Sequence, residues 1–154
     1  MRNMRMLPVV AVLFALTAQA FFADTVIPAD RLPPQIRDTV TAAFPERTIR
    51  RAKADSHEYE VVLDDGTEIE FYQDGIWKEI DSRAEIPGSL LPEFVTVYVR
   101  EHFPGAAVCK AEKNRKHLAV EISDGTELYF SHDGHCLRKK TARGHDRHHS
   151  DHHW

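Results

Sequence analysis

The sequence predicts an α+β fold: a tandem repeat of a helix plus a four-stranded antiparallel sheet, with the helices on one face of the sheets. The main observation is an acidic strand–turn–strand–turn pattern over residues 60–75 that returns over residues 119–134. When 32–79 is aligned without a gap on 91–138, 14 positions are identical. Unrelated residues at ordinary usage would give roughly three identities in such a span. A unit repeated at a fixed offset is typical of repeat architectures.

The repeat sets the expected domain organisation of this 154-residue chain. The two units are predicted to span 32–80 and 91–140, with a linker between them that contains a Pro-Gly turn signal. A hydrophobic core is marginal in a unit of roughly fifty residues. We therefore expect the units to support each other inside one domain, 24–140, followed by a histidine-rich, disordered tail over 141–154.

Residues 1–23 are predicted to be a secretory signal peptide rather than part of the fold. Arg2 and Arg5 form a positive n-region, and residues 7–16 form an apolar run of h-region length. Ala18-Gln19-Ala20 supplies a small-x-small cleavage pattern. The apolar run is too short for a membrane span, and the alternative is an uncleaved anchor. The exact cleavage site stays open, because two phenylalanines follow the first candidate site.

The leader predicts export, so the mature chain is expected in the bacterial periplasm or outside the cell, without a stable membrane span. Removal of the two leader arginines changes the formal net charge from −4 to −6 with neutral histidine. A mildly acidic chain argues against nucleic acid as the main partner.

A short amphipathic helix is predicted over 33–44. Proline is tolerated in the first turn of a helix, and the segment begins with two prolines. Ile36, Val40 and Phe44 then fall on one helical face, and Pro45 ends the helix. The second unit carries the same pattern up to its own Phe-Pro.

The segment after this helix predicts four short strands with one covered face. Apolar residues alternate with polar ones, which is the period of a sheet that packs on one side. Asp65-Gly66 is a strong hairpin signal, because both turn positions favour residues that accept positive φ, and a second Asp-Gly turn follows. The residues expected to face the helix are Tyr59, Val61, Leu63, Ile69 and Phe71.

The ordered pattern resembles the PepSY-like family, whose members are described as β-lactamase-inhibitor-like. The resemblance rests on a helix ending at Phe-Pro, a basic strand, and x-Val-x-Leu/Ile-x-Asp-Gly-Thr-Glu-x-x-Phe-x-x-Asp-Gly, and it spans about 32–140. It implies an exported bacterial protein with tandem units, each a helix packed on a four-stranded antiparallel sheet. It also implies a binding or inhibitory role rather than catalysis, without identifying the target.

The sheet face turned away from the helices is the predicted binding face. Tyrosine and tryptophan are frequent interface anchors, and the direction of Trp77 is open because a turn precedes it. The alternative is that these strands are ordinary solvated strands, since exposed single aromatics are common. The candidate partner-binding residues are Glu70, Tyr72, Trp77 and Tyr129.

The C-terminal tail is a second candidate, for metal. Half of the ten histidines lie there, and neutral imidazole and carboxylate are ligands for zinc, nickel and copper. No cofactor is required by the predicted fold, so we expect weak binding by a flexible chelating tail. The alternatives are a solubilising tail that binds metal incidentally and, less in keeping with its interrupted histidines, a purification tag. The candidate ligands are His145, Asp146, His148, His149, Asp151, His152 and His153.

The hairpin itself, Asp-Gly-Thr-Glu in both copies, is interpreted as scaffold rather than as an acidic cation site. The turn and the inward apolar residues recur, whereas the outward residues differ: Glu70 stands where the second copy has Tyr129, and Val62 where it has Glu121. Specificity is therefore expected at the outward positions where the copies disagree.

The two cysteines and the catalytic motifs give little further information about function. Cys109 and Cys136 fall on the first and fourth strands of the second unit, which in a meander lie about 14 Å apart, too far for a disulfide. We therefore expect no bond between them unless the strand order is not a meander. An intermolecular bond or two partly buried thiols are the alternatives. The sequence lacks Gly-x-Ser-x-Gly, His-Glu-x-x-His and a glycine-rich phosphate loop, so we expect no enzyme.

Overall fold

The structure is a computed structural model and describes residues 25–141. Within these residues nine strands form one antiparallel sheet, in which each strand pairs with its neighbours in sequence, from β1 to β9. The first five are β1 Thr25–Ile27, β2 Ile49–Ala54, β3 Glu58–Leu63, β4 Glu68–Tyr72 and β5 Trp77–Asp81. The other four are β6 Val108–Lys113, β7 Leu118–Ile122, β8 Glu127–Phe130 and β9 Cys136–Lys140.

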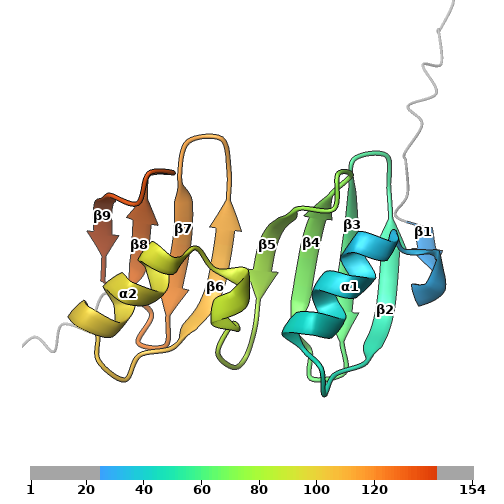
Figure 1. Cartoon of the computed structure of the whole chain (residues 1–154), viewed down its shortest axis with the longest axis horizontal. Helices are drawn as coiled ribbons and strands as arrows, with labels where there is room; N and C mark the ends of the chain where they lie inside the picture. The colour runs from blue at the N-terminus through green and yellow to red at the C-terminus, as the bar shows by residue number, and fades with distance from the viewer. Residues whose placement is uncertain (1–24, 142–154) are drawn as a thin grey trace, which may run out of the picture.

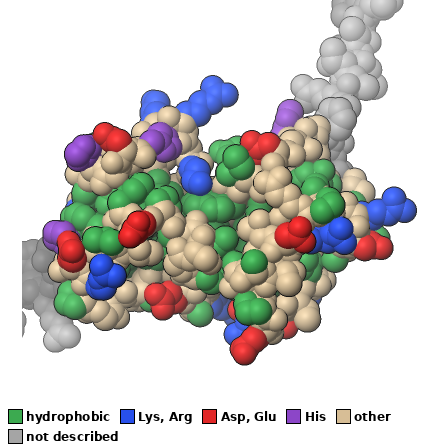
Figure 2. Space-filling view, viewed as in Figure 1, with side chains coloured by type: hydrophobic (Ala, Val, Ile, Leu, Met, Phe, Trp, Pro, Cys, Tyr) green, Lys and Arg blue, Asp and Glu red, His purple; other side chains and the backbone are tan. Residues whose placement is uncertain are grey.

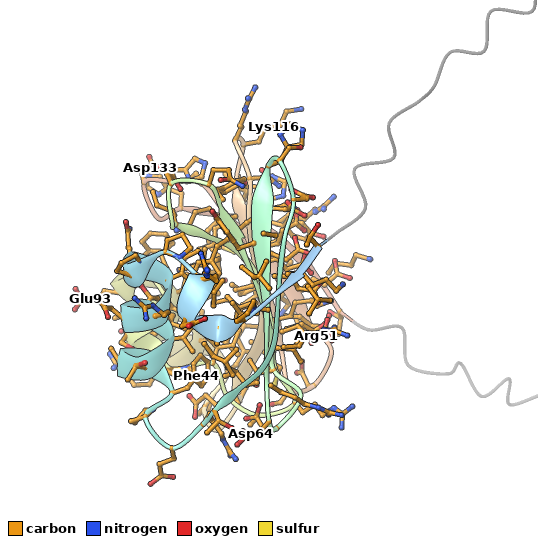
Figure 3. The ribbon with its side chains drawn as sticks, turned by 90° about the vertical axis from the view of Figure 1, so that its right-hand side faces the viewer. Phe44, Arg51, Asp64, Glu93, Lys116 and Asp133 are labelled. Carbon is orange, nitrogen blue, oxygen red and sulfur yellow. The ribbon has the colours of Figure 1, made fainter. Side chains whose placement is uncertain are left out.

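Two helices lie on the same side of this sheet (Figures 1 and 3). In Figure 1, α1 (Pro34–Ala43) crosses in front of the strands of the first half and α2 (Glu93–His102) in front of those of the second. Each helix follows a single 3-10 turn, η1 (Ala29–Arg31) or η2 (Gly88–Leu90). The molecule therefore has two layers, and the other side of the sheet carries no helix in the part of the chain described.

The predicted fold class is wrong in its architecture. The sequence predicted a tandem repeat of a helix plus a four-stranded sheet, but the strands form one continuous nine-stranded sheet. The two halves are joined by pairing of β5 with β6, where Ile80 lies opposite Ala111 and Asp81 opposite Lys110. The sheet also contains β1, a strand that was not expected, which pairs with β2.

The unpaired edges of small sheets explain why one sheet forms. Two separate sheets would each leave an edge with unpaired N–H and C=O groups beside the linker, and such edges are avoided or covered in natural proteins. Ile80 and Ala111 are both fully buried, so the pairing also makes the hydrophobic core continuous. Alternation along each strand predicts which residues face inward, but it does not say which strand is the neighbour across a linker.

The core is one cluster of apolar side chains between the helices and the sheet. From the helices come Ile36, Val40, Val95 and Val99, all buried. From the sheet, Phe71 on β4 and Phe130 on β8 are both 0% exposed. Figure 2 views the helix side, where green hydrophobic side chains show between the charged ones. Full burial of such a side chain contributes about 1.5–3 kcal/mol, which makes these positions the main source of stability.

The first helix differs from its predicted range of 33–44 by one residue at each end. Pro33 is the residue before the first turn, where its missing N–H has no intrahelical partner in any helix. At the other end, the Phe44 N–H donates to the Val40 carbonyl at 2.8 Å, and Pro45 prevents a further turn. Neither helix of residues 25–141 is long and apolar enough to cross a membrane.

The two cysteines are free thiols in the structure. Cys109 lies on β6 and Cys136 on β9, with two strands between them in the sheet. The predicted signal peptide over 1–23 and most of the tail, from residue 142 onward, lie outside the described residues.

The turn before β9 generates a stability prediction. Gly134 has a φ of +93°, and a Cβ there would lie 3.0 Å from the ring of Phe94 at the start of α2. Gly105 has a φ of +84° and nothing within 4 Å of such a Cβ. We expect Gly105→Ala to lower the free energy of unfolding by about 1–2 kcal/mol through backbone strain. Gly134→Ala should cost about 1–3 kcal/mol more through overpacking.

Urea unfolding of the two variants and of the wild type measures this difference. Gly105→Ala is the matched control, because it carries the same backbone strain without the ring contact. Equal losses in the two variants would show that Phe94 does not constrain the turn.

Candidate binding face of the sheet

The side of the sheet that faces away from the helices is defined here as the open face. Strand register places its outward residues in two rows that run across the strands from β2 to β9. The first row is Lys53, Glu60, Glu70, Glu79, Glu112, Ala119, Tyr129 and Arg138. The second row is Arg51, Val62, Glu68, Asp81, Lys110, Glu121, Glu127 and Lys140. The face is therefore acidic in the middle strands and basic at both sides.

The basic end on β2 neutralises the first carboxylate of the row. The Glu60 carboxylate accepts hydrogen bonds from Arg51 at 2.8 Å and from Lys53 at 2.9 Å. Partial burial by itself would raise the pKa of Glu60, but the bonds from Lys53 and Arg51 outweigh it and hold the pKa below its ordinary value. Glu60 is thus charged and internally paired.

Lys78 holds the next carboxylates together. Its ammonium donates to Glu58 at 2.6 Å and to Glu70 at 2.8 Å, both on the open face. The hydrogen bond to Glu58, followed by that to Glu70, raises the pKa of Lys78. Glu70 and Glu79 are direct cross-strand neighbours, and like charges in that position are destabilising. A bridging cation on β5 offsets part of that repulsion.

Lys110 spans the junction between the two halves of the sheet. Its ammonium lies 2.8 Å from an Asp81 oxygen and 3.7 Å from a Glu79 oxygen, both on β5. The hydrogen bond to Asp81 raises the pKa of Lys110. The same β5–β6 pairing that closes the core is therefore bridged on the open face by an ion pair.

Three carboxylates of the open face have no ion pair or hydrogen bond within residues 25–141: Glu68, Glu112 and Glu121. Glu112 is also the direct neighbour of Glu79, which extends an unbroken run of carboxylates from β3 to β6. Such a run lowers stability, so it is a feature for which the fold alone supplies no reason.

Three of the four predicted partner-binding residues lie on the open face. Glu70 is paired with Lys78. Tyr72 is 37% exposed, and its hydroxyl donates to the Lys113 carbonyl at 3.1 Å. Tyr129 donates to Glu127 at 2.5 Å.

Trp77 lies on the helix side instead. Its side chain is 7% exposed, and its indole N–H donates to the Leu90 carbonyl at 3.0 Å. The register shifts between Glu70 and Phe71, so that Trp77 stands opposite the buried Phe71. Trp77 is thus a core residue, and the binding role expected for it does not fit its position.

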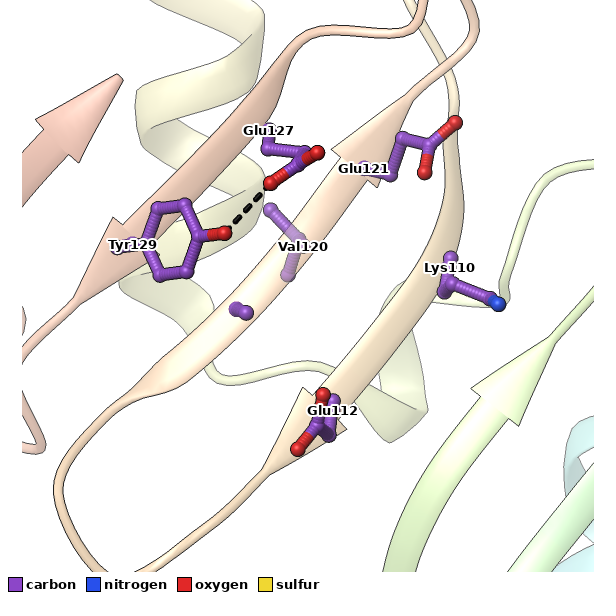
Figure 4. A pocket seen from close by; sticks show the side chains of 7 residues that line it. Lys110, Glu112, Val120, Glu121, Glu127 and Tyr129 are labelled. Atoms are coloured by element: carbon purple, nitrogen blue, oxygen red, sulfur yellow. Dashed lines mark hydrogen bonds between the residues drawn. The ribbon is translucent and has the colours of Figure 1, made fainter. Parts of the chain in front are cut away.

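Ala119 is an outward residue whose importance the sequence alone did not indicate. It lies between Glu112 on β6 and Tyr129 on β8, and a hollow of about 210 Å³ opens there in the face. Figure 4 shows Glu112, Glu121 and Glu127 around this hollow, with Tyr129 bonded to Glu127. The gapless alignment of the two halves, which sets Ala119 over Glu60, was the available signal.

The bonds of Tyr129 hold its ring beside this hollow. The guanidinium of Arg138 on β9 lies 4.0 Å from the ring centroid of Tyr129, and Lys140 donates to Glu127 at 2.9 Å. The hydrogen bond from Tyr129, followed by that from Lys140, lowers the pKa of Glu127. Glu127 is therefore charged and already satisfied, unlike Glu112 and Glu121.

A family model described as "Putative beta-lactamase-inhibitor-like, PepSY-like" matches the chain over residues 22–63 and 57–138. The chain belongs to the PepSY-like family. The resemblance predicted from the sequence is thereby confirmed.

Two solved structures show the same fold. One is a "putative calcium-regulated periplasmic protein" from Bacteroides thetaiotaomicron, 27% identical, with a TM-score of 0.73; the match covers 77% of this chain and 97% of that one. The other is a "putative periplasmic protein of unknown function" from Bacteroides vulgatus, also 27% identical, with a TM-score of 0.71; the match covers 76% of this chain and 98% of that one. Comparison with the curated proteins found no match.

These relatives also bear on location. Both structures are of proteins described as periplasmic, which confirms the predicted location of this PepSY-like protein in the periplasm or outside the cell. Within residues 25–141 no group of three or more His, Cys, Asp or Glu side chains is arranged to hold a metal ion. The predicted metal ligands, from His145 to His153, lie outside the described residues.

The pairing of Glu60 predicts a pH-dependent contribution to stability. Because the folded-state pKa lies below the ordinary 4.5, the contribution is complete above that value and is lost as the pH falls through the folded pKa. We expect Glu60→Gln to lower the free energy of unfolding by about 1 kcal/mol at pH 7. The difference between wild type and variant should shrink as the pH falls below 4.5 toward 3. Urea unfolding at the two pH values measures both differences.

The control is Glu101→Gln, an exposed carboxylate on α2 without an ion pair in the described residues. It should change the free energy of unfolding by less than about 0.5 kcal/mol at either pH. An equal loss in Glu60→Gln at pH 7 and pH 3 would contradict a role for the ion pairs.

Proposed function

We propose that this PepSY-like protein is an exported binding module that lays the open face of its sheet over a protein partner. The partner class that we propose is a secreted or envelope hydrolase, which the module inhibits or modulates. One observation carries the proposal: the helices cover one face of the sheet, while the outward rows of β2 to β9 form a continuous face that no helix of residues 25–141 covers.

The extent of the open face supports a protein partner rather than a small molecule. Eight strands at spacings of about 4.8 Å give a face roughly 34 Å wide, which matches the lateral size of an interface that buries roughly 800 Å² on each partner. Tyr72 and Tyr129 lie on β4 and β8, in different halves of the sheet, and tyrosine is enriched among residues that dominate binding energy. Burial of both would require a partner that spans the β5–β6 junction.

The family description favours binding over catalysis. It names inhibitor-like proteins, and the sequence carries none of the nucleophile, metal or phosphate-loop motifs searched for. Hydrolase inhibition is proposed from that description alone, whereas use of the open face is proposed because the helices leave that face of the sheet uncovered. The two parts of the proposal are therefore tested separately.

For the face, we expect the Tyr72→Ala/Tyr129→Ala double variant to lose the partners that wild type captures from a periplasmic extract. Truncation of a central interface tyrosine costs about 1–2 kcal/mol, so the two together should weaken binding by about 30-fold to 800-fold. Capture on immobilised protein, followed by mass spectrometry and titration of the captured partner, measures the loss.

Glu101→Ala on α2 is the matched control, because it changes an exposed side chain on the helix side. It should capture the same partners as wild type. If the double variant also retains them while its circular dichroism shows an intact fold, the open face is not the binding surface.

For the target, purified hydrolases of the cell envelope, with serine β-lactamases among them, are titrated with the protein. The supporting result is a loss of hydrolase activity at stoichiometric wild-type protein and full activity at the same concentration of the double tyrosine variant. Full activity of every captured hydrolase at saturating protein would leave a binding module without inhibition.

A second candidate is envelope metal binding through the tail. It is favoured by the spacing of the five tail histidines and two aspartates, which allows several of them to reach one zinc, nickel or copper ion. This activity would be compatible with partner binding, because the candidate metal ligands and the open face are different residues.

The tail prediction is tested by truncation. We expect the full chain to bind Zn²⁺, Cu²⁺ and Ni²⁺ in calorimetry, and a 1–140 truncation to lose that binding, because the imidazole and carboxylate ligands are removed. Equal affinity in both proteins would exclude the tail as the site. A variant that changes only His57 and His102, which lie outside the tail, is the control and should bind as the full chain does.

A further inference from the structure

The hollow over Ala119 is a gap in a row of long side chains. In its row the neighbours of Ala119 are the long side chains of Glu112 and Tyr129, and direct cross-strand neighbours have Cβ atoms about 5 Å apart. An alanine between them leaves the space of one extended side chain empty. The hollow of about 210 Å³ is several times the roughly 30 Å³ that one water occupies in the liquid.

The corresponding place in the first half is filled and neutral. There Lys53, Glu60 and Glu70 occupy the same register that Glu112, Ala119 and Tyr129 occupy in the second half. The Glu60 side chain fills the space, and its charge is paired within 3 Å by Arg51 and Lys53. Glu60, Glu68 and Glu70 line a hollow of only about 60 Å³. A larger one of about 450 Å³ lies beside it, but it is lined by Arg50, Arg51 and Arg83. In the second half, a carboxylate stands where the first half has its lysine.

The charges around the large hollow call for a cation. Glu112 makes no ion pair or hydrogen bond with any residue of 25–141, and Glu121 has only a longer-range attraction to Lys110. Lys110 lines the hollow and stands opposite Glu121 in register, but its ammonium is bound to Asp81 at 2.8 Å. Glu127 is satisfied by Tyr129 and Lys140. Glu112 and Glu121 thus face the hollow beside a lysine that makes its ion pair with β5.

We propose that this hollow takes an arginine or lysine side chain of the protein partner. The stem of such a side chain packs against Tyr129 and Ala119, and its charged end meets Glu112 and Glu121. Arginine suits the site best, because its planar fork offers five N–H donors to two carboxylates. The inference rests on the proposed function, since it names the group that a partner presents to the open face.

The charge pattern favours this occupant over the others. A lone ion would need several carboxylates converging on one point, and no such group exists in residues 25–141. A basic side chain instead uses both features of the hollow, because its apolar stem fits the depth and its cation matches the two free carboxylates.

The test adds each of two pentapeptides to the full chain and follows the amide chemical shifts of the protein by NMR. One peptide is acetyl-Thr-Val-Arg-Val-Thr-amide, and the other has glutamine in place of the arginine. We expect the arginine peptide to shift the amides of Glu112, Ala119 and Glu121 with millimolar affinity, and the glutamine peptide to shift none of them at the same concentration. Because the contact is ionic, affinity should fall several-fold between 50 and 200 mM NaCl.

Two variants separate shape from charge. Ala119→Gln fills the hollow, and Glu112→Gln/Glu121→Gln removes the carboxylates; each should weaken the arginine peptide at least tenfold. The double glutamine variant should also be no less stable than wild type, since it removes like-charge repulsion. Glu85→Gln, in the linker beside α2, is the control and should bind as wild type does.

Several outcomes overturn the inference: equal shifts with both peptides, undiminished binding by Ala119→Gln, or the same shifts from CaCl₂ alone at lower concentration. The proposed function fails separately. If a captured hydrolase binds Ala119→Gln as tightly as wild type, the inference about the hollow is wrong, but the proposed use of the open face is not contradicted. If the peptide binds in the hollow but no protein partner is captured, the proposed function is wrong, but the inference about the hollow is not contradicted.

Discussion

The pairing of β5 with β6 is the contact on which the rest of the molecule depends. It joins strands from two halves that are each too small for a robust core, and it does so through Ile80 and Ala111, which are both buried. On the other face the same pairing places Lys110 against Asp81. The β5–β6 pairing therefore makes both the core and the open face continuous. A partner that spans both halves meets a single rigid sheet rather than two sheets joined by a linker.

The first helix and the hairpin turns were predictable from the sequence, whereas the pairing of strands across the linker was not. Pro33, Pro45 and the Asp-Gly turns set their own backbone geometry, so the first helix and the hairpins follow from short stretches of chain. The junction at Ile80 and Ala111 depends on contacts 31 residues apart, and no periodicity encodes them. The direction of Trp77 depended on a one-residue shift in register, which reverses the face of every residue beyond it.

The candidate site was predictable in outline for the same reason. Alternation placed Glu70, Tyr72 and Tyr129 on the outward face, because that assignment needs only the period of a strand. The ion pairs of Lys78 and Lys110 needed strand order as well, and these pairs decide which carboxylates stay free. Prediction of the hollow would have required a comparison of side-chain size across three strands, at Glu112, Ala119 and Tyr129. That comparison becomes meaningful only once the register is known.

The open face combines features that lower stability with features that would serve recognition. Aligned carboxylates from Glu60 to Glu112 repel one another, and replacing alternate ones with lysine would give the cross-strand pairs that stabilise ordinary sheets. The first half of the face approaches that solution with Arg51, Lys53 and Lys78, while the second half departs from it at Glu112 and Ala119. Selection for stability alone would be expected to pair Glu112 with a cation and to fill the space over Ala119, as the first half does at Glu60. Under the proposed function, this difference places the acidic hollow in the half that holds Tyr129, while the first half contributes Tyr72 from a part of the face whose charges are mostly paired.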